Sequence, residues 1–105
     1  MNMNQYQSLA MNTCKPSSRY IEYMVLGLTS EAGEVAGKLK KYIRDKTPLG
    51  ELDEDLAKEI GDCLWYIAGI AEVLGIDLNA VAIDNLEKLR SRKARNVIAG
   101  SGDER

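Results

Sequence analysis

The sequence predicts an all-α protein, an antiparallel bundle of about four helices. Apolar residues recur at steps of three and four along most of the chain, which is the period of an amphipathic helix. No stretch alternates between apolar and polar residues as a half-buried strand would. With no phenylalanine and only two prolines in 105 residues, long uninterrupted helices are favoured.

The first half of the chain is predicted to form two helices. A short one covers residues 4–12. The segment Pro16-Ser17-Ser18 interrupts the pattern and supplies a serine N-cap for a long amphipathic helix over residues 18–44. Residues 45–50, which include Pro48, are predicted to form a turn.

The second half is predicted to form two more helices. Acidic residues crowd the start of the third, where they complement the helix dipole, and it runs to about Leu74. From Leu64 onward it is apolar on nearly every side, so this part is either central or lies in an oligomer interface. Gly75 ends it and Asp77 caps a fourth helix over residues 78–96. We therefore expect one domain over residues 1–97, followed by a disordered polar segment over residues 98–105.

Composition excludes several classes of function. The net charge is −2, and no basic run is dense enough to follow a phosphate backbone, so no nucleic-acid polymer is expected as a partner. No apolar run is long enough to span a bilayer and no signal peptide is visible, so we expect a cytoplasmic protein without a membrane partner. The absence of histidine removes imidazole bases and Ser-His or Cys-His pairs. Chemistry must then depend on carboxylates, Lys, Arg, Tyr and metal.

Two pairs of acids, Glu31 with Glu34 and Glu59 with Asp62, have the same three-residue spacing. This spacing places both acids of a pair on one helix face, one turn apart, where like charges repel. Glu31 and Glu59 also lie within the apolar stripes, and a carboxylate near a helix–helix seam is costly unless it is paired or bound to metal. The four acids therefore predict a metal site. The alternative is that they are surface acids paired with Lys38, Lys41 or Lys58.

Oxygen ligands without His or Cys favour Mg²⁺, with Mn²⁺ as a possible substitute. Mg²⁺ keeps several waters and completes its shell with substrate phosphates, so a phosphate ester or anhydride is the expected substrate, and an activated water is the expected nucleophile. Gly33 and Gly61 lie inside the two acid motifs. We expect them to let the two helices approach closely there.

Five side chains are candidates to bind phosphate: Lys38, Tyr66, Asn85, Lys88 and Arg92. The last three share one face of the fourth helix, Lys38 follows an acid by one turn, and Tyr66 could offer its hydroxyl. The alternatives are a solvated charged face for Lys88 and Arg92 and core packing for Tyr66. For the base, an aromatic ring and an amide are the usual contacts, which makes Tyr6, Gln7 and Trp65 candidates, although Tyr6 could equally pack on the core.

The motif Glu31-x-x-Glu34, a gap of 24 residues and Glu59-x-x-Asp62 resembles the E-x-x-E…E-x-x-D signature of the MazG-type, all-α nucleoside triphosphate pyrophosphohydrolases. The surroundings Leu28-Thr29-Ser30-Glu31-Ala32-Gly33-Glu34-Val35 and Asp62-Cys63-Leu64-Trp65-Tyr66 are also similar, and Asn85-x-x-Lys88-x-x-x-Arg92 resembles the family's phosphate-binding helix. The resemblance extends over most of the chain.

The resemblance implies Mg²⁺-dependent hydrolysis of a (deoxy)nucleoside triphosphate to the monophosphate and pyrophosphate, often as house-cleaning of the nucleotide pool. It implies that the four acids bind metal and that one of them orients or deprotonates water. It also implies a homo-oligomer, a dimer or a dimer of dimers, whose helices complete the bundle around the site.

Two other functions remain open. The chain could be a non-catalytic helical oligomer, a scaffold or regulatory partner whose acids form interchain salt bridges. It could also hydrolyse another phosphate compound, as the phosphoribosyl-ATP pyrophosphohydrolases of the same architecture do.

Overall fold

The computed structural model describes residues 1–46 and 48–105. Within that part it contains four α-helices, one 3₁₀ turn and no strand, which confirms the predicted all-α fold. The elements are α1 (Met3–Met11), the 3₁₀ turn η1 (Pro16–Ser18), α2 (Ile21–Asp45), α3 (Leu49–Leu74) and α4 (Leu78–Ala94). The predicted turn at residues 45–50 includes Thr47, which lies outside the described residues. The observed bounds lie within three residues of those predicted.

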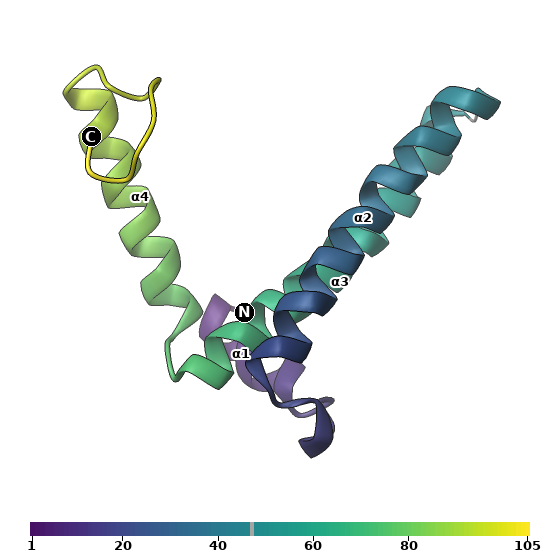
Figure 1. The fold of residues 1–105 in the computed structure, drawn as a ribbon, viewed down its shortest axis with the longest axis horizontal. Coiled ribbons are helices and arrows are strands. Elements are labelled where there is room, and N and C mark those ends of the chain that lie inside the picture. Colours follow the sequence, from purple (N-terminus) through teal and green to yellow (C-terminus); the bar gives the residue numbers. More distant parts are fainter. Residues whose placement is uncertain (47) are drawn as a thin grey trace.

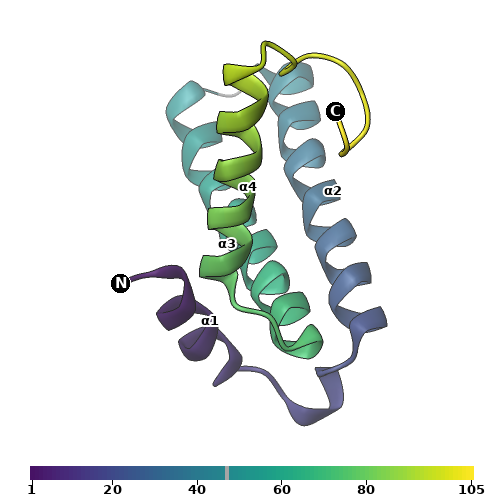
Figure 2. The ribbon, with the colours of Figure 1, turned by 90° about the vertical axis from the view of Figure 1, so that its left-hand side faces the viewer.

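The helices form a V (Figure 1). One arm is a long antiparallel hairpin in which α2 packs along α3, and α1 lies across the base of this hairpin. The other arm is α4, which leaves α3 at an angle of 103° and has its main contacts with α1. Figure 2, turned by 90°, shows α4 alone in front of the hairpin. In the described residues of one chain, α4 therefore does not pack lengthwise on the hairpin.

The helix ends show two differences from the sequence-based expectation. Ser18 does not cap α2, because it belongs to η1 and Tyr20 is the N-cap without a side-chain hydrogen bond. Gly75 ends α3 with a φ of 69°, as predicted. Asp77 occupies the N-cap position of α4, but its side chain makes no capping bond.

Side chains of α1 cap α4 instead. The Gln7 side-chain oxygen accepts a hydrogen bond from the Leu78 amide at 2.9 Å. The Asn4 side-chain oxygen accepts one from the Asn79 amide at 3.0 Å. Two of the amides that a helix start leaves unpaired are satisfied in this way. The short first helix thus holds the start of α4 in place.

The core is small and lies where α1 crosses the hairpin. Its buried members are Ala10, Met11, Cys14, Met24, Ala68, Ala71 and Leu78. Close helix approach occurs here rather than at the acid motifs, so the expectation for Gly33 and Gly61 was wrong. A Cβ added at either position would meet nothing within 4 Å, whereas one at Gly69 would collide with the Met24 side chain.

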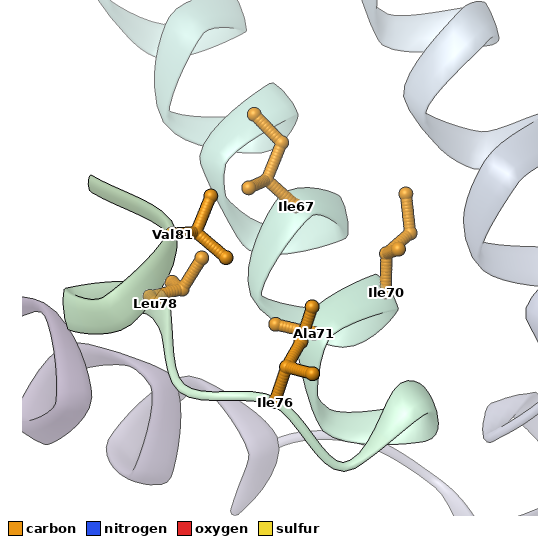
Figure 3. A pocket seen from close by; sticks show the side chains of 6 residues that line it. All are labelled: Ile67, Ile70, Ala71, Ile76, Leu78 and Val81. Carbon is orange, nitrogen blue, oxygen red and sulfur yellow. The ribbon is translucent and has the colours of Figure 1, made fainter. Parts of the chain in front are cut away.

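Much apolar surface stays exposed on both arms. On α4, Val81, Ile83, Leu86 and Leu89 are each at least 40% exposed. At the elbow between the arms, α3 and the start of α4 enclose an apolar pocket of about 130 Å³ (Figure 3). Six side chains line it: Ile67, Ile70, Ala71, Ile76, Leu78 and Val81.

Among the helices of the described residues, none taken singly is long and apolar enough to cross a membrane. Only the bent pair Gly50–Leu74 and Leu78–Ala94 meets that requirement, and it does so by length and composition alone.

Candidate metal centre

Three carboxylates converge midway along the hairpin. Glu31 of α2 and Glu59 and Asp62 of α3 each offer one carboxylate oxygen, and these oxygens lie within 4.8 Å of one another. Glu31 and Glu59 are half-buried and Asp62 is exposed. The pairing of α2 with α3 brings Glu31 beside two acids that lie 28 or more residues further along the chain. The three-residue spacing within one helix therefore explains only part of the cluster.

The cluster is electrostatically unfavourable without a cation. The pKa of Glu31 is raised, first by desolvation, then by a hydrogen bond with Glu59 and by the nearby charges of Asp62, Glu59 and Glu34. The nearest cation in the described residues is Lys38, whose Nζ lies 4.0 Å from Glu59 Oε1. One ammonium at that distance does not balance three carboxylates. An all-carboxylate donor set of this kind fits a hard divalent cation such as Mg²⁺.

Glu34 and Lys38 continue the acid face of α2. Glu34 is exposed and does not belong to the three-acid cluster, although its charge contributes to the raised pKa of Glu31. Lys38 reaches Glu59 as an ion pair, which is one of the alternatives that the sequence left open. The structure thus places both residues beside the cluster.

A pocket of about 370 Å³ adjoins the acids and is lined by Glu31, Asp62, Trp65 and Tyr66. Trp65 and Tyr66 meet edge to face, with ring centroids 5.0 Å apart and an interplanar angle of 84°. The Trp65 indole N–H donates to the Ala10 carbonyl and to the Thr13 hydroxyl, so α1 fixes the orientation of this ring. The pocket combines an acidic wall with an aromatic wall.

Tyr66 lines this pocket, and Tyr23 lies against Tyr66 with ring centroids 6.2 Å apart. The pKa of Tyr66 is raised by desolvation, then by a hydrogen bond with Tyr23 and by the charges of Tyr23, Glu31 and Asp62. The pKa of Tyr6 is raised by desolvation and then by the charge of Asp62, and Tyr6 packs against the buried core cluster. The sequence analysis did not single out Tyr23. Its spacing of eight residues from Glu31, close to two helical turns, is the signal that could have identified it.

Gln7 points away from the acid pocket. It is buried, and its amide nitrogen donates to the Glu72 carboxylate and to the Ile76 carbonyl, both at 3.0 Å, while its oxygen caps α4. Every polar atom of this side chain is therefore engaged within the fold. The structure does not bring Gln7 together with the acids.

The predicted phosphate-binding face of α4 lies on the other arm. Asn85 and Lys88 line a separate hollow of about 340 Å³ together with Val81 and Asp84. Arg92 is buried. The structure thus groups Asn85 and Lys88 with each other but not with the acids of the same chain.

Residues 97–105, of which 98–105 were expected to be disordered, fold back along the end of α4 (Figures 1 and 2). Lys88 Nζ lies 3.4 Å from the Asp103 carboxylate, and Arg92 donates to the Asp103 carbonyl at 3.0 Å. The sequence analysis did not identify Asp103, because it lies outside any helical period.

Comparison with known proteins identifies the family of the chain. The profile of the family described as "MazG nucleotide pyrophosphohydrolase domain" matches residues 19–97. The chain is also 48% identical over 87 residues to the "Gene 37 protein" of Mycobacterium phage L5, an alignment that covers 81% of this chain and 76% of that protein. No solved structure matches significantly. The chain belongs to the MazG nucleotide pyrophosphohydrolase family.

Proposed function

We propose that this protein is a Mg²⁺-dependent pyrophosphohydrolase that cleaves a (deoxy)nucleoside triphosphate to the monophosphate and pyrophosphate and so removes unwanted nucleotides from the pool. The observation that carries the proposal is the cluster of Glu31, Glu59 and Asp62 beside an aromatic-walled pocket, in a chain of this family. A nucleotide needs both parts, a cation for its phosphates and a flat apolar surface for its base.

Each residue of the pocket then has a role. Glu31, Glu59 and Asp62 hold Mg²⁺, or Mn²⁺ in its place. The bound ion supplies charge neutralisation for the phosphates and activation of a water molecule. Glu34, one turn from Glu31 and outside the cluster, is placed to orient that water or to add a further ligand. The exposed parts of Trp65 and Tyr66 offer a surface against which the base can stack.

The cations that bind the outer phosphates come from a second copy of the chain. Asn85 and Lys88 lie on α4, which leaves the hairpin at 103°, and the acids lie on α2 and α3. Figure 1 shows α4 and this hairpin as separate arms. In a closed C₂ dimer, α4 of each copy can lie between the two arms of the other copy. The basic face of one α4 then faces the acids of the other copy. The charges of the two arms are complementary in this arrangement.

The exposed apolar surface supports the same arrangement. The side chains of α4 that lie open to solvent and the elbow pocket of Figure 3 are unfavourable in water. Arms of a second copy can cover both. We therefore propose a homodimer, alone or paired into a tetramer, as the working form.

Pyrophosphate release from a panel of canonical and damaged (deoxy)nucleoside triphosphates tests the activity. We expect release with Mg²⁺, none with EDTA, and loss of turnover in Glu59→Gln and Asp62→Asn with helix content retained by circular dichroism. The exposed acid Glu87, on the other arm, provides the control Glu87→Gln. If the whole panel gives no release, the function is wrong and a non-nucleotide phosphate substrate or a scaffold takes its place.

A further inference from the structure

Residues 97–105 make a compact strap over the end of α4. The Arg105 side chain donates to the carbonyls of Val97, Ile98 and Gly102, and Arg95 donates to the Arg105 carbonyl. These bonds close the segment on itself and hold it beside α4 (Figure 2). The family match ends at residue 97, so the strap lies almost wholly beyond the shared region.

Asp103 of the strap forms ion pairs with two cations of α4, Lys88 and Arg92. Its carboxylate lies 3.4 Å from Lys88 Nζ and 3.5 Å from Arg92 Nη2. A carboxylate oxygen shared by an ammonium and a guanidinium places negative charge where a phosphate oxygen bound by the same two groups would place it. The ion pairs also lower the pKa of Asp103, mainly through the charge of Lys88.

The docked strap leaves one polar group unsatisfied. Arg92 is 5% exposed, and its Nε is a buried donor with no hydrogen-bond partner among the described residues. Its Nη2 meanwhile contacts Gly102 and Asp103. A buried donor without an acceptor is costly, and the Asp103 side chain is itself 85% exposed. The ion pair between Lys88 and Asp103 is exposed on both sides and is therefore weak, so a stronger anion can displace the strap.

We propose that the strap is an autoinhibitory element in which the Asp103 carboxylate stands in for a substrate phosphate on Lys88 and Arg92, and that a polyphosphate must displace it to bind. The proposal rests on the phosphate-binding role that the proposed function gives to Lys88 and that the sequence analysis expects of Arg92. While the strap is docked, the apparent affinity for a polyphosphate is reduced by the fraction of molecules in which these cations are occupied.

Calorimetric binding of inorganic tripolyphosphate in EDTA tests the proposal without turnover. Asp103→Asn should bind tripolyphosphate about threefold to tenfold more tightly than the wild type, because a shared charged acceptor no longer competes. The control Glu104→Gln removes the same charge one residue away, from an exposed side chain, and should change the affinity by less than about twofold. Unchanged or weaker binding by Asp103→Asn, or equal tightening in both variants, would overturn the proposal.

A double-mutant cycle tests the direct contact. In a Lys88→Ala background the tightening caused by Asp103→Asn should shrink, since one of the two masked cations is gone. Full tightening in that background would show that Asp103 acts at a distance and would contradict the strap. Thermal unfolding of each variant verifies that the fold is retained.

Turnover separates this proposal from the function on which it rests. If the wild type releases pyrophosphate and Asp103→Asn lowers KM with kcat unchanged, both stand. If turnover is present but neither tripolyphosphate binding nor KM responds to Asp103→Asn, only the strap fails. If tripolyphosphate binding tightens but no triphosphate is hydrolysed, only the proposed activity fails.

Discussion

At the scale of single residues, the acid cluster brings three like charges close together. The pKa of Glu31 is raised by desolvation and by the neighbouring carboxylates of Glu59, Asp62 and Glu34, so the ionised form of Glu31 is disfavoured in the fold. Lys38 approaches only one member of the cluster. We therefore expect the cluster to lower the stability of the metal-free fold and a bound cation to restore it.

Glu31→Gln should raise the melting temperature of the metal-free protein near pH 7. The raised pKa means that the unfolded chain ionises Glu31 at a lower pH than the folded chain does, so the wild type loses stability as pH rises through that interval. The gain should vanish well below the ordinary pKa of 4.5, where the group is protonated in both states. Thermal unfolding in EDTA at both pH values measures this.

The same variant should also lose its response to metal. Mg²⁺ should raise the melting temperature of the wild type and have little effect on Glu31→Gln, while the control Glu87→Gln should behave as the wild type. A variant that is less stable than the wild type without metal, and that responds normally to Mg²⁺, would show that Glu31 has a structural role instead.

The residue scale is also where the sequence was most informative. The three-residue spacing in each pair and the position of Glu31 and Glu59 in the apolar stripes were enough to expect a carboxylate cluster on two helices. Which acids come closest depends on the register of α2 against α3. The residues that set this contact, Met24 against Gly69 and Tyr66 against Gly27, lie beyond the acid motifs, so the exclusion of Glu34 from the cluster could not be foreseen.

At the scale of elements, close packing of the hairpin occurs near its base. Gly69 lies against Met24, a fully buried side chain, whereas Gly61 faces open space. Helical glycines in one chain thus serve different purposes. All of these glycines lie inside helices, and the sequence does not show which of them packs against a neighbouring helix. Close approach was therefore expected at Gly33 and Gly61, whereas it occurs at Gly69.

Gly69→Ala should lower the free energy of unfolding by about 1–3 kcal/mol, because the added methyl group displaces Met24 in a packed core. Gly61→Ala is the matched control and should be neutral or raise stability by up to about 1 kcal/mol, since alanine favours a helix. Urea unfolding of both variants measures the difference. Equal effects would contradict the packing described at the base of the hairpin.

The second feature at this scale is the capping of α4 by α1. Gln7 and Leu78 are 71 residues apart in sequence, so no local pattern could indicate that Gln7 supports the elbow. The end of α3 and the start of α4 were predictable from Gly75 and Asp77. The direction that α4 takes was not, because it depends on these long-range hydrogen bonds.

Gln7→Met should lower the free energy of unfolding by about 1–3 kcal/mol, because it leaves the Leu78 amide and the Ile76 carbonyl without their buried partner. The exposed residue Ser8 on the same helix gives the control Ser8→Ala, for which we expect little change. Urea unfolding measures stability, and KM for two triphosphates of different base measures selectivity. A change in base preference without loss of stability would support the predicted base-binding role of Gln7.

At the scale of the whole molecule, the V separates the acid cluster of the hairpin from the basic residues of α4 (Figure 1). The all-α class and the number of helices followed from periodicity and turn residues. The opening between the arms did not, since a sequence pattern shows that a face is apolar but not what covers it. The surplus apolar surface on the third helix did indicate that a single chain leaves something uncovered.

Mixing two inactive variants should restore activity if sites are shared between copies. Glu31→Gln and Lys88→Ala each damage every site of a homodimer, but a heterodimer of the two has one intact site. An equal mixture should then regain about a quarter of wild-type turnover, because half of the dimers are mixed and each has one working site of two. Glu31→Gln mixed with Glu59→Gln is the control and should stay inactive.

Light scattering in solution provides the independent measurement of assembly. We expect a mass of at least a dimer at micromolar concentration. A monomer that retains turnover would contradict the shared site, and a dimer whose mixed variants stay inactive would mean that Lys88 serves the acids of its own chain.

The position of Trp65 has a practical consequence. It is the single tryptophan of the chain, it lines the acid pocket, and its N–H is held by α1. Excitation at the red edge of protein absorbance therefore reports on one ring beside the three carboxylates. The emission of this ring should respond when a cation or a nucleotide enters, so the wild-type protein carries its own optical reporter of occupancy without any label.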